Sequence, residues 1–182
     1  MKQNIKKVAI LGAGTMGAQI AGHLANAGIP SLLFDMDQEL AEKGKEALKL
    51  LKPAPLYKPD NIELVSACNY EEDLEKISET DWVLEAVVER LDIKEKVYSN
   101  LLPHLKETAI LTSNTSGIPL SDLAENLPIE VKERFMITHF FNPPRYMQLL
   151  ELVRGEHTTE DTYKRIATFG EYVLGKGIVH AK

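Results

Sequence analysis

The hydrophobic positions of the chain alternate between short continuous runs and longer segments with helical spacing. Apolar runs of strand length occur at residues 6–11, 31–34, 62–65, 82–87, 109–112, 135–138, 149–153 and 177–180. Between them, apolar residues spaced by three or four predict helices over residues 15–27, 38–51, 70–76, 92–102, 119–127 and 159–174. Strands that alternate with helices in this way are typical of an α/β Rossmann-type fold with a mostly parallel, doubly wound sheet.

The turn between the first predicted strand and helix has the sequence G-A-G-T-M-G, a G-x-G-x-x-G motif. Gly12 permits a tight turn, Gly14 leaves room for a pyrophosphate, and Gly17 lets the helix lie close to the strand. Unpaired N–H groups at the start of a helix attract phosphate. The residues predicted to contact a dinucleotide here are Gly12, Gly14, Thr15, Met16 and Gly17.

Asp35 ends the second predicted strand, 18 residues after Gly17. A carboxylate at this place accepts hydrogen bonds from the ribose diol of NAD. Its charge would repel the 2′-phosphate of NADP, and no Arg or Lys follows before Lys43. We therefore predict NAD as the cofactor and Asp35 as one of its binding residues.

Composition and charge exclude several other classes of protein. The 182 residues have the size of one domain, and the net charge of −6 does not favour nucleic acid or an anionic membrane as a partner. No apolar run approaches the roughly 20 residues of a membrane helix, and the first strand begins too early for a signal peptide, so we expect a cytoplasmic protein. The histidines and the single Cys68 share no metal-ligand spacing, and no metal is predicted.

Several polar residues fall at the ends of predicted strands, where ligands bind in a doubly wound sheet. One cleft is expected to collect Gly12, Asp35, residues 86–89, residues 113–116 and His139.

His139 and Glu151 form the candidate catalytic pair. Glu151 lies twelve residues after His139, in the next predicted strand, so a hairpin-like return would bring the two side chains together. A carboxylate on one imidazole nitrogen fixes the tautomer, and the other nitrogen can then take a hydroxyl proton as a hydride leaves the same carbon. A histidine at a strand end is also often a packed or surface residue, and the residues alone leave both interpretations open.

The loop S-N-T-S and Glu89 are ambiguous in the same way. Ser116 and Asn114 would lie near the nicotinamide end of a bound cofactor, but such residues also serve as helix caps and turns. Glu89 is either a ribose contact or an exposed loop acid.

With G-A-G-T-M-G, S-N-T-S, H-F-F-N-P-P and E-L-V-R-G in this order, the chain resembles the L-3-hydroxyacyl-CoA dehydrogenase family of fatty-acid β-oxidation over nearly its whole length. The resemblance implies NAD-dependent oxidation of a 3-hydroxyacyl-CoA to the 3-ketoacyl-CoA, with His139 as base, Glu151 as its partner and Ser116 bound to the reacting oxygen. Further cofactor contacts are implied for Asp35, Ala86, Glu89, Lys94 and Asn114, and substrate contacts for Ser116 and Asn142.

Members of this family usually continue into a helical domain that supplies a further catalytic Asn, acyl-chain contacts and most of the dimer interface. We therefore expect residues 1–182 to form the NAD-binding domain alone, with weak turnover or none, from a dimeric or multifunctional parent protein. The short segment between residues 52 and 62 is more like that of members fused to an enoyl-CoA hydratase.

Two other interpretations stay open: a free-standing NAD-binding module without catalysis, and a 3-hydroxyacid dehydrogenase with a substrate that carries no CoA.

Overall fold

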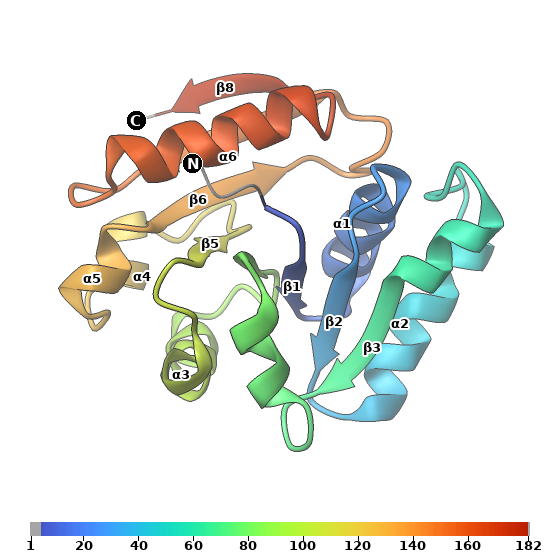
Figure 1. Ribbon diagram of the computed structural model, residues 1–182, viewed down its shortest axis with the longest axis horizontal. Helices are drawn as coiled ribbons and strands as arrows, with labels where there is room; N and C mark the ends of the chain where they lie inside the picture. The colour runs from blue at the N-terminus through green and yellow to red at the C-terminus, as the bar shows by residue number, and fades with distance from the viewer. Residues whose placement is uncertain (1–4, 182) are drawn as a thin grey trace.

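An eight-stranded sheet in the order β3-β2-β1-β4-β5-β6-β7-β8 organises the molecule (Figure 1). The structure is a computed structural model that describes residues 5–181. The parallel strands are β1 Val8–Leu11, β2 Ser31–Asp35, β3 Val65–Asn69, β4 Trp82–Glu85, β5 Ile110–Ser113 and β6 Phe135–Phe140. The last two strands are β7 Leu149–Arg154, antiparallel to β6, and β8 Gly177–Ala181, parallel to β7. The predicted Rossmann-type sheet is confirmed.

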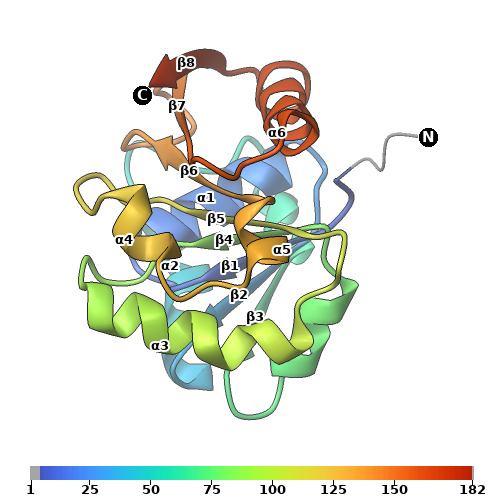
Figure 2. The ribbon, with the colours of Figure 1, turned by 90° about the vertical axis from the view of Figure 1, so that its left-hand side faces the viewer.

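Helices cover both faces of this sheet, which is why its central strands are continuous apolar runs. One face packs against α1 Thr15–Asn26, α2 Gln38–Leu50 and α6 Glu160–Tyr172. The other packs against α3 Leu91–Leu101, α4 Leu120–Ala124 and α5 Ile129–Lys132. Figure 2 shows α6 and α3 on opposite sides of the strands. The part of the chain that the structure describes also contains three short 3₁₀ helices: η1 Pro59–Leu64, η2 Leu74–Glu79 and η3 Leu102–His104.

The helices begin and end largely as the sequence predicts. The Asp37 carboxylate caps α2 by accepting the backbone N–H of Leu40 at 2.8 Å. Gly28 follows α1 with a φ of 76°, a left-handed conformation that favours glycine.

The strand predicted at residues 62–65 is wrong. Residues 62–64 belong to η1, and β3 begins only at Val65. Ile62 in η1 and Val65 at the start of β3 enter the same apolar cluster, so the apolar run alone does not show where the strand begins.

Two predicted helices are also shorter or displaced. In place of a helix at 70–76, the Asn69 side chain accepts the backbone N–H groups of Glu71 and Glu72 and holds a turn, and η2 starts at Leu74. The helix predicted over 119–127 ends as α4 at Ala124, because Pro128 disfavours helical backbone just before it and starts α5 separately. Within residues 5–181, no helix is long and apolar enough to cross a membrane.

His23, on α1, provides a test of the packing between α1 and the end of α6. His23 is 6% exposed, and its Nε2 lies 3.2 Å from the Leu174 carbonyl oxygen. Burial, with the nearby charge of Lys176, lowers the pKa of His23 from 6.5 to about 4.

We expect this histidine to reduce stability in acid. Between pH 6.5 and about 4, the unfolded chain binds a proton on His23 that the folded chain does not bind. The free energy of unfolding therefore decreases by about 3 kcal/mol in total as the pH is lowered through this range. His23→Gln keeps a donor for the Leu174 carbonyl and removes the titration. Urea unfolding of the unchanged protein and of His23→Gln, near neutral pH and near pH 4, measures the difference between their free energies of unfolding. An equal fall in this free energy for both proteins would contradict the burial of a neutral His23 ring.

Candidate active site

The carboxyl ends of β1, β2, β4, β5 and β6 lie at one edge of the sheet, and a pocket of about 310 Å³ opens there. Of the predicted cofactor residues, it is lined by Met16, Ala86, Glu89, Lys94 and Asn114. The predicted catalytic and substrate residues in its wall are Ser116, His139 and Asn142. The pocket therefore gathers expected residues from the ends of β4, β5 and β6, whereas Gly12, Asp35 and Glu151 lie outside its lining.

The glycine turn has the form that a dinucleotide needs. Gly12 has a φ of 105°, and a Cβ there would lie 2.7 Å from the Ala86 carbonyl oxygen. A Cβ on Gly17 would lie 1.8 Å from the carbonyl oxygen of Gly12, so glycine alone allows α1 to start this close to β1. A Cβ on Gly14 would meet nothing within 4 Å, which leaves the open approach that a pyrophosphate requires.

Asp35 braces this turn from the end of β2. Its Oδ2 accepts the backbone N–H of Ala13, and its Oδ1 accepts that of Met36, each at 2.7 Å. Each carboxylate oxygen has a further lone pair, so both remain able to accept from a ribose diol.

His139 and Glu151 face each other across the antiparallel pair of β6 and β7. His139 Nδ1 lies 3.0 Å from Glu151 Oε2, and their side chains are 20% and 33% exposed. A carboxylate can only accept here, so Nδ1 carries the hydrogen and Nε2 is the free ring nitrogen. The Phe141 ring lies against the imidazole, with 4.7 Å between the ring centroids.

Glu89 anchors the loop that follows β5. Its Oε1 accepts hydrogen bonds from the Thr115 hydroxyl and from the backbone N–H groups of Ser116 at 3.0 Å and Gly117 at 3.1 Å. Partial burial opposes the charge, but these bonds and the charge of Lys94 outweigh it and lower the pKa of Glu89. Glu89 is therefore an ionised anchor of the loop; its contact with the cofactor stays a prediction.

Asn114 has a structural role beside its predicted one. Its Oδ1 accepts the backbone N–H of Phe140 at 2.9 Å, immediately after His139. The S-N-T-S loop and the strand that carries His139 are thus tied together.

Glu85 is the residue that sequence reasoning missed. It ends β4 with 0% exposure, and its Oε1 accepts from Lys94 Nζ at 2.7 Å and from the Val87 N–H at 2.8 Å. Its Oε2 accepts from the Tyr98 hydroxyl at 3.0 Å and the Ser113 hydroxyl at 2.6 Å. A single buried carboxylate therefore joins the loop after β4 to α3 and to the end of β5. An acid at the end of an otherwise apolar strand is the signal that could have identified it.

Lys94 borders the pocket, but two carboxylates already bind its ammonium group. Its side chain is 1% exposed and lies 2.7 Å from Glu85 and 3.3 Å from Glu89. Lys94 thus links the buried network to the carboxylate that anchors the S-N-T-S loop.

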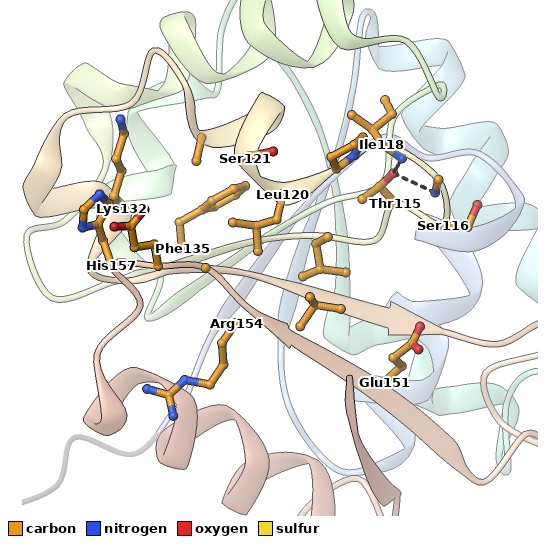
Figure 3. A pocket seen from close by; sticks show the side chains of 17 residues that line it. Thr115, Ser116, Ile118, Leu120, Ser121, Lys132, Phe135, Glu151, Arg154 and His157 are labelled. Carbon is orange, nitrogen blue, oxygen red and sulfur yellow. Dashed lines mark hydrogen bonds between the residues drawn. The ribbon is translucent and has the colours of Figure 1, made fainter. Parts of the chain in front are cut away.

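A second, larger pocket of about 620 Å³ shares Ser116 with the first and also includes Glu151 in its wall. Figure 3 shows Ser116 and Glu151 toward one end, Lys132 and His157 at the other, and Leu120 and Phe135 between them. Among residues 5–181, no group of three or more His, Cys, Asp or Glu residues could hold a metal ion.

The strand order β3-β2-β1-β4-β5-β6, the glycine turn and the acid at the end of β2 define a dinucleotide-binding domain. Residues 7–182 match the family described as 3-hydroxyacyl-CoA dehydrogenase, NAD binding domain. The chain belongs to this family, and NAD is its cofactor, as predicted.

Known relatives agree with this assignment. The chain is 42% identical to a Bacillus subtilis protein named "Probable 3-hydroxyacyl-CoA dehydrogenase" and 36% identical to the fatty acid oxidation complex subunit alpha of Idiomarina loihiensis, over 100% and 96% of its length. It superposes on the solved (S)-3-hydroxybutyryl-CoA dehydrogenase of Ralstonia eutropha with a TM-score of 0.85 at 30% identity, over 98% of this chain and 64% of that one. It spans only 26% and 24% of the two curated relatives.

Gly14 and Gly17 give a matched pair of variants for the cofactor turn. Gly14→Ala should fold normally, because its backbone is extended and a Cβ meets no atom, yet NADH affinity should fall by about tenfold or more. Gly17→Ala should instead lose roughly 3 kcal/mol of stability, because its Cβ meets backbone. Calorimetric titration with NADH and urea unfolding separate the two effects. Normal NADH affinity in Gly14→Ala would show that the pyrophosphate does not pass over this residue.

Glu85→Ala should destabilise the domain by about 3–5 kcal/mol, because it leaves the buried Lys94 ammonium without its closest carboxylate. Glu171, an exposed residue of α6, supplies the control: Glu171→Ala should change the free energy of unfolding by no more than about 0.5 kcal/mol. Similar urea midpoints for the two variants would contradict the proposed importance of the network.

Proposed function

We propose that this chain is the NAD-binding domain of an enzyme that oxidises (S)-3-hydroxyacyl-CoA to 3-ketoacyl-CoA in fatty-acid β-oxidation. Its His139–Glu151 pair serves as the general base. The observation that carries the proposal is the 3.0 Å contact between His139 Nδ1 and Glu151 Oε2, at the edge of the sheet that also holds the glycine turn.

The chemistry assigned to these side chains follows from their hydrogen bonding. The Glu151 carboxylate holds the imidazole so that Nε2 is an acceptor, and its charge stabilises the imidazolium that forms. His139 Nε2 takes the proton of the substrate hydroxyl, and the Ser116 hydroxyl donates to the same oxygen. NAD, when bound, supplies the acceptor for the hydride that leaves the carbon. In the reverse direction, the imidazolium returns the proton to the reduced carbonyl.

The larger pocket supports an acyl substrate. It continues from Ser116 and Glu151 over apolar side chains that include Leu120, Phe135 and Val153. An apolar groove beside the proton-transferring groups suits the hydrocarbon part of an acyl thioester, whose burial is favourable in proportion to its area.

The remaining parts of the proposal concern the longer protein. Relatives in which this domain is about a quarter of the length support a longer, multifunctional parent protein. A helical domain, a dimeric assembly and an acyl-CoA partner are further parts of the proposal. We propose that residues 1–182 are the NAD-binding domain of such a parent, although residues 1–4 and 182 lie outside the described part of the chain. A cytoplasmic location stays a prediction.

The role of the His139–Glu151 pair is tested in a fusion of this chain with the segment that follows the matching region of its Bacillus subtilis relative. The assay follows the oxidation of NADH in the presence of acetoacetyl-CoA. We expect His139→Gln to lower kcat roughly 1000-fold and Glu151→Gln roughly 100-fold, because a positioned base contributes this much. His104→Gln, away from the site, is the control.

The outcomes of this experiment also separate the alternatives. A rate that neither substitution changes would remove the dyad from the mechanism. NADH binding without turnover in the extended chain would favour a non-catalytic module. Faster turnover of a free 3-oxo acid than of its CoA thioester would favour a substrate that carries no CoA.

A further inference from the structure

The Gln19 side chain joins α1, the helix that begins at the glycine turn, to the loop that follows His139. Gln19 is 7% exposed on α1. Its Nε2 lies 3.2 Å from the Thr15 carbonyl oxygen and 3.2 Å from Asn142 Oδ1. One nitrogen of one buried amide therefore contacts both the first turn of α1 and a residue of the H-F-F-N-P-P run.

These two contacts determine how the Asn142 amide is turned. The Thr15 carbonyl can only accept a hydrogen bond, so the Gln19 atom beside it must be the NH₂ group. The same NH₂ group faces Asn142, and the Asn142 atom opposite must therefore be the acceptor Oδ1. The Nδ2 group, which carries both N–H donors, is left as the free end of the Asn142 amide.

Asn142 is an exposed residue in the wall of the pocket that also contains Met16, Ser116 and His139. We propose that Gln19 is a positioning residue that turns the Asn142 amide so that it offers N–H donors, rather than a carbonyl oxygen, to a ligand in this pocket. The ligand group it selects is a carbonyl oxygen, of an acyl thioester or of a carboxamide. This inference rests on the proposed function only for the identity of the ligand.

The backbone next to Asn142 is held by other residues, so the loop should keep its position when Gln19 is changed. Lys176 is 4% exposed, and its Nζ donates to the carbonyl oxygens of Pro144 and, at 2.7 Å, Met147. Arg145 donates to two carbonyl oxygens of the loop at residues 54–56.

The orientation can be measured on the ligand-free chain by NMR, with Gln19→Glu as the reversing variant. A carboxylate at position 19 can only accept, so Asn142 should turn and donate Nδ2 to it. In the unchanged protein, the Asn142 Nδ2 protons should show nuclear Overhauser effects to the pocket side, including Phe141. In Gln19→Glu they should show them to the side-chain methylene protons at position 19. Nδ2 protons that already face α1 in the unchanged protein, or the same pattern in both proteins, would overturn the inference.

The consequence for ligands is measured by titrating the chain with NADH and, separately, with acetoacetyl-CoA in the presence of NAD. Gln148→Glu is the matched control, because Gln148 is exposed and the substitution is the same. We expect Gln19→Glu to weaken one of the two ligands roughly tenfold, the effect of about one hydrogen bond, and the affected ligand identifies the source of the carbonyl.

A second variant separates the donor from its support. Asn142→Asp keeps an acceptor for Gln19 and removes the N–H donor, so it should lower the affinity for the same ligand. The double variant, Gln19→Glu with Asn142→Asp, should lose no more affinity than the more strongly affected single variant. Equal affinities for both ligands in Gln19→Glu and Gln148→Glu would overturn the proposed selection. A protein that binds neither ligand would contradict the proposed function, and the NMR measurement would still decide the orientation of Asn142.

Discussion

The reversed direction of β7 is the constraint on which the candidate active site depends. Parallel strands bring the ends of β1, β2, β4, β5 and β6 to one edge, where loops can collect ligand-binding groups. Because β7 runs antiparallel to β6, the start of β7 lies beside the end of β6 and brings residues of its own to the same edge. Glu151 is thereby paired directly with His139, at a distance fixed by the backbone ladder of the sheet. Leu150 and Leu152, buried on the α6 side, hold β7 in this register.

A buried polar network around Glu85 fixes the positions of the loops at the same edge of the sheet. Glu85 receives four hydrogen bonds inside the protein, and they reach β5, α3 and the loop after β4. Burial and the charge of Glu85 raise the pKa of Tyr98, so its phenol stays protonated and donates. Through Lys94 the network also reaches Glu89, which holds the S-N-T-S loop. A charge cluster of this kind is costly to bury, and here every carboxylate oxygen of Glu85 is paired, which gives the loops one defined arrangement.

The features that could be predicted from the sequence are those that local chemistry determines. The glycine turn, the cap at Asp37 and the continuous apolar strands each follow from the residues involved, and the parallel order of the sheet follows from their alternation. The start of β3 could not be predicted, because a short apolar run such as residues 62–65 fits a strand or a helical turn, and its spacing does not separate the two.

The partners of polar side chains were the other part that could not be predicted. Glu85 and Ser113 form a hydrogen bond although they are 28 residues apart in the sequence, and Gln19 and Asn142 do so although they are 123 residues apart. Spacing along the chain carries no information about such contacts, which arise only when the sheet is assembled. The pairing of His139 with Glu151, only twelve residues apart, could be expected because a single return of the chain joins them.

The most direct test of this account is a crystal structure of the chain with NADH bound. The account predicts the pyrophosphate over Gly14, the adenosine ribose at Asp35, and the nicotinamide in the pocket with His139, with Nε2 of the imidazole facing its reactive carbon while Nδ1 remains on Glu151. A nicotinamide bound outside this pocket, or a His139 ring turned away from Glu151 in the complex, would contradict the central claim that the sheet brings cofactor and general base to the same place.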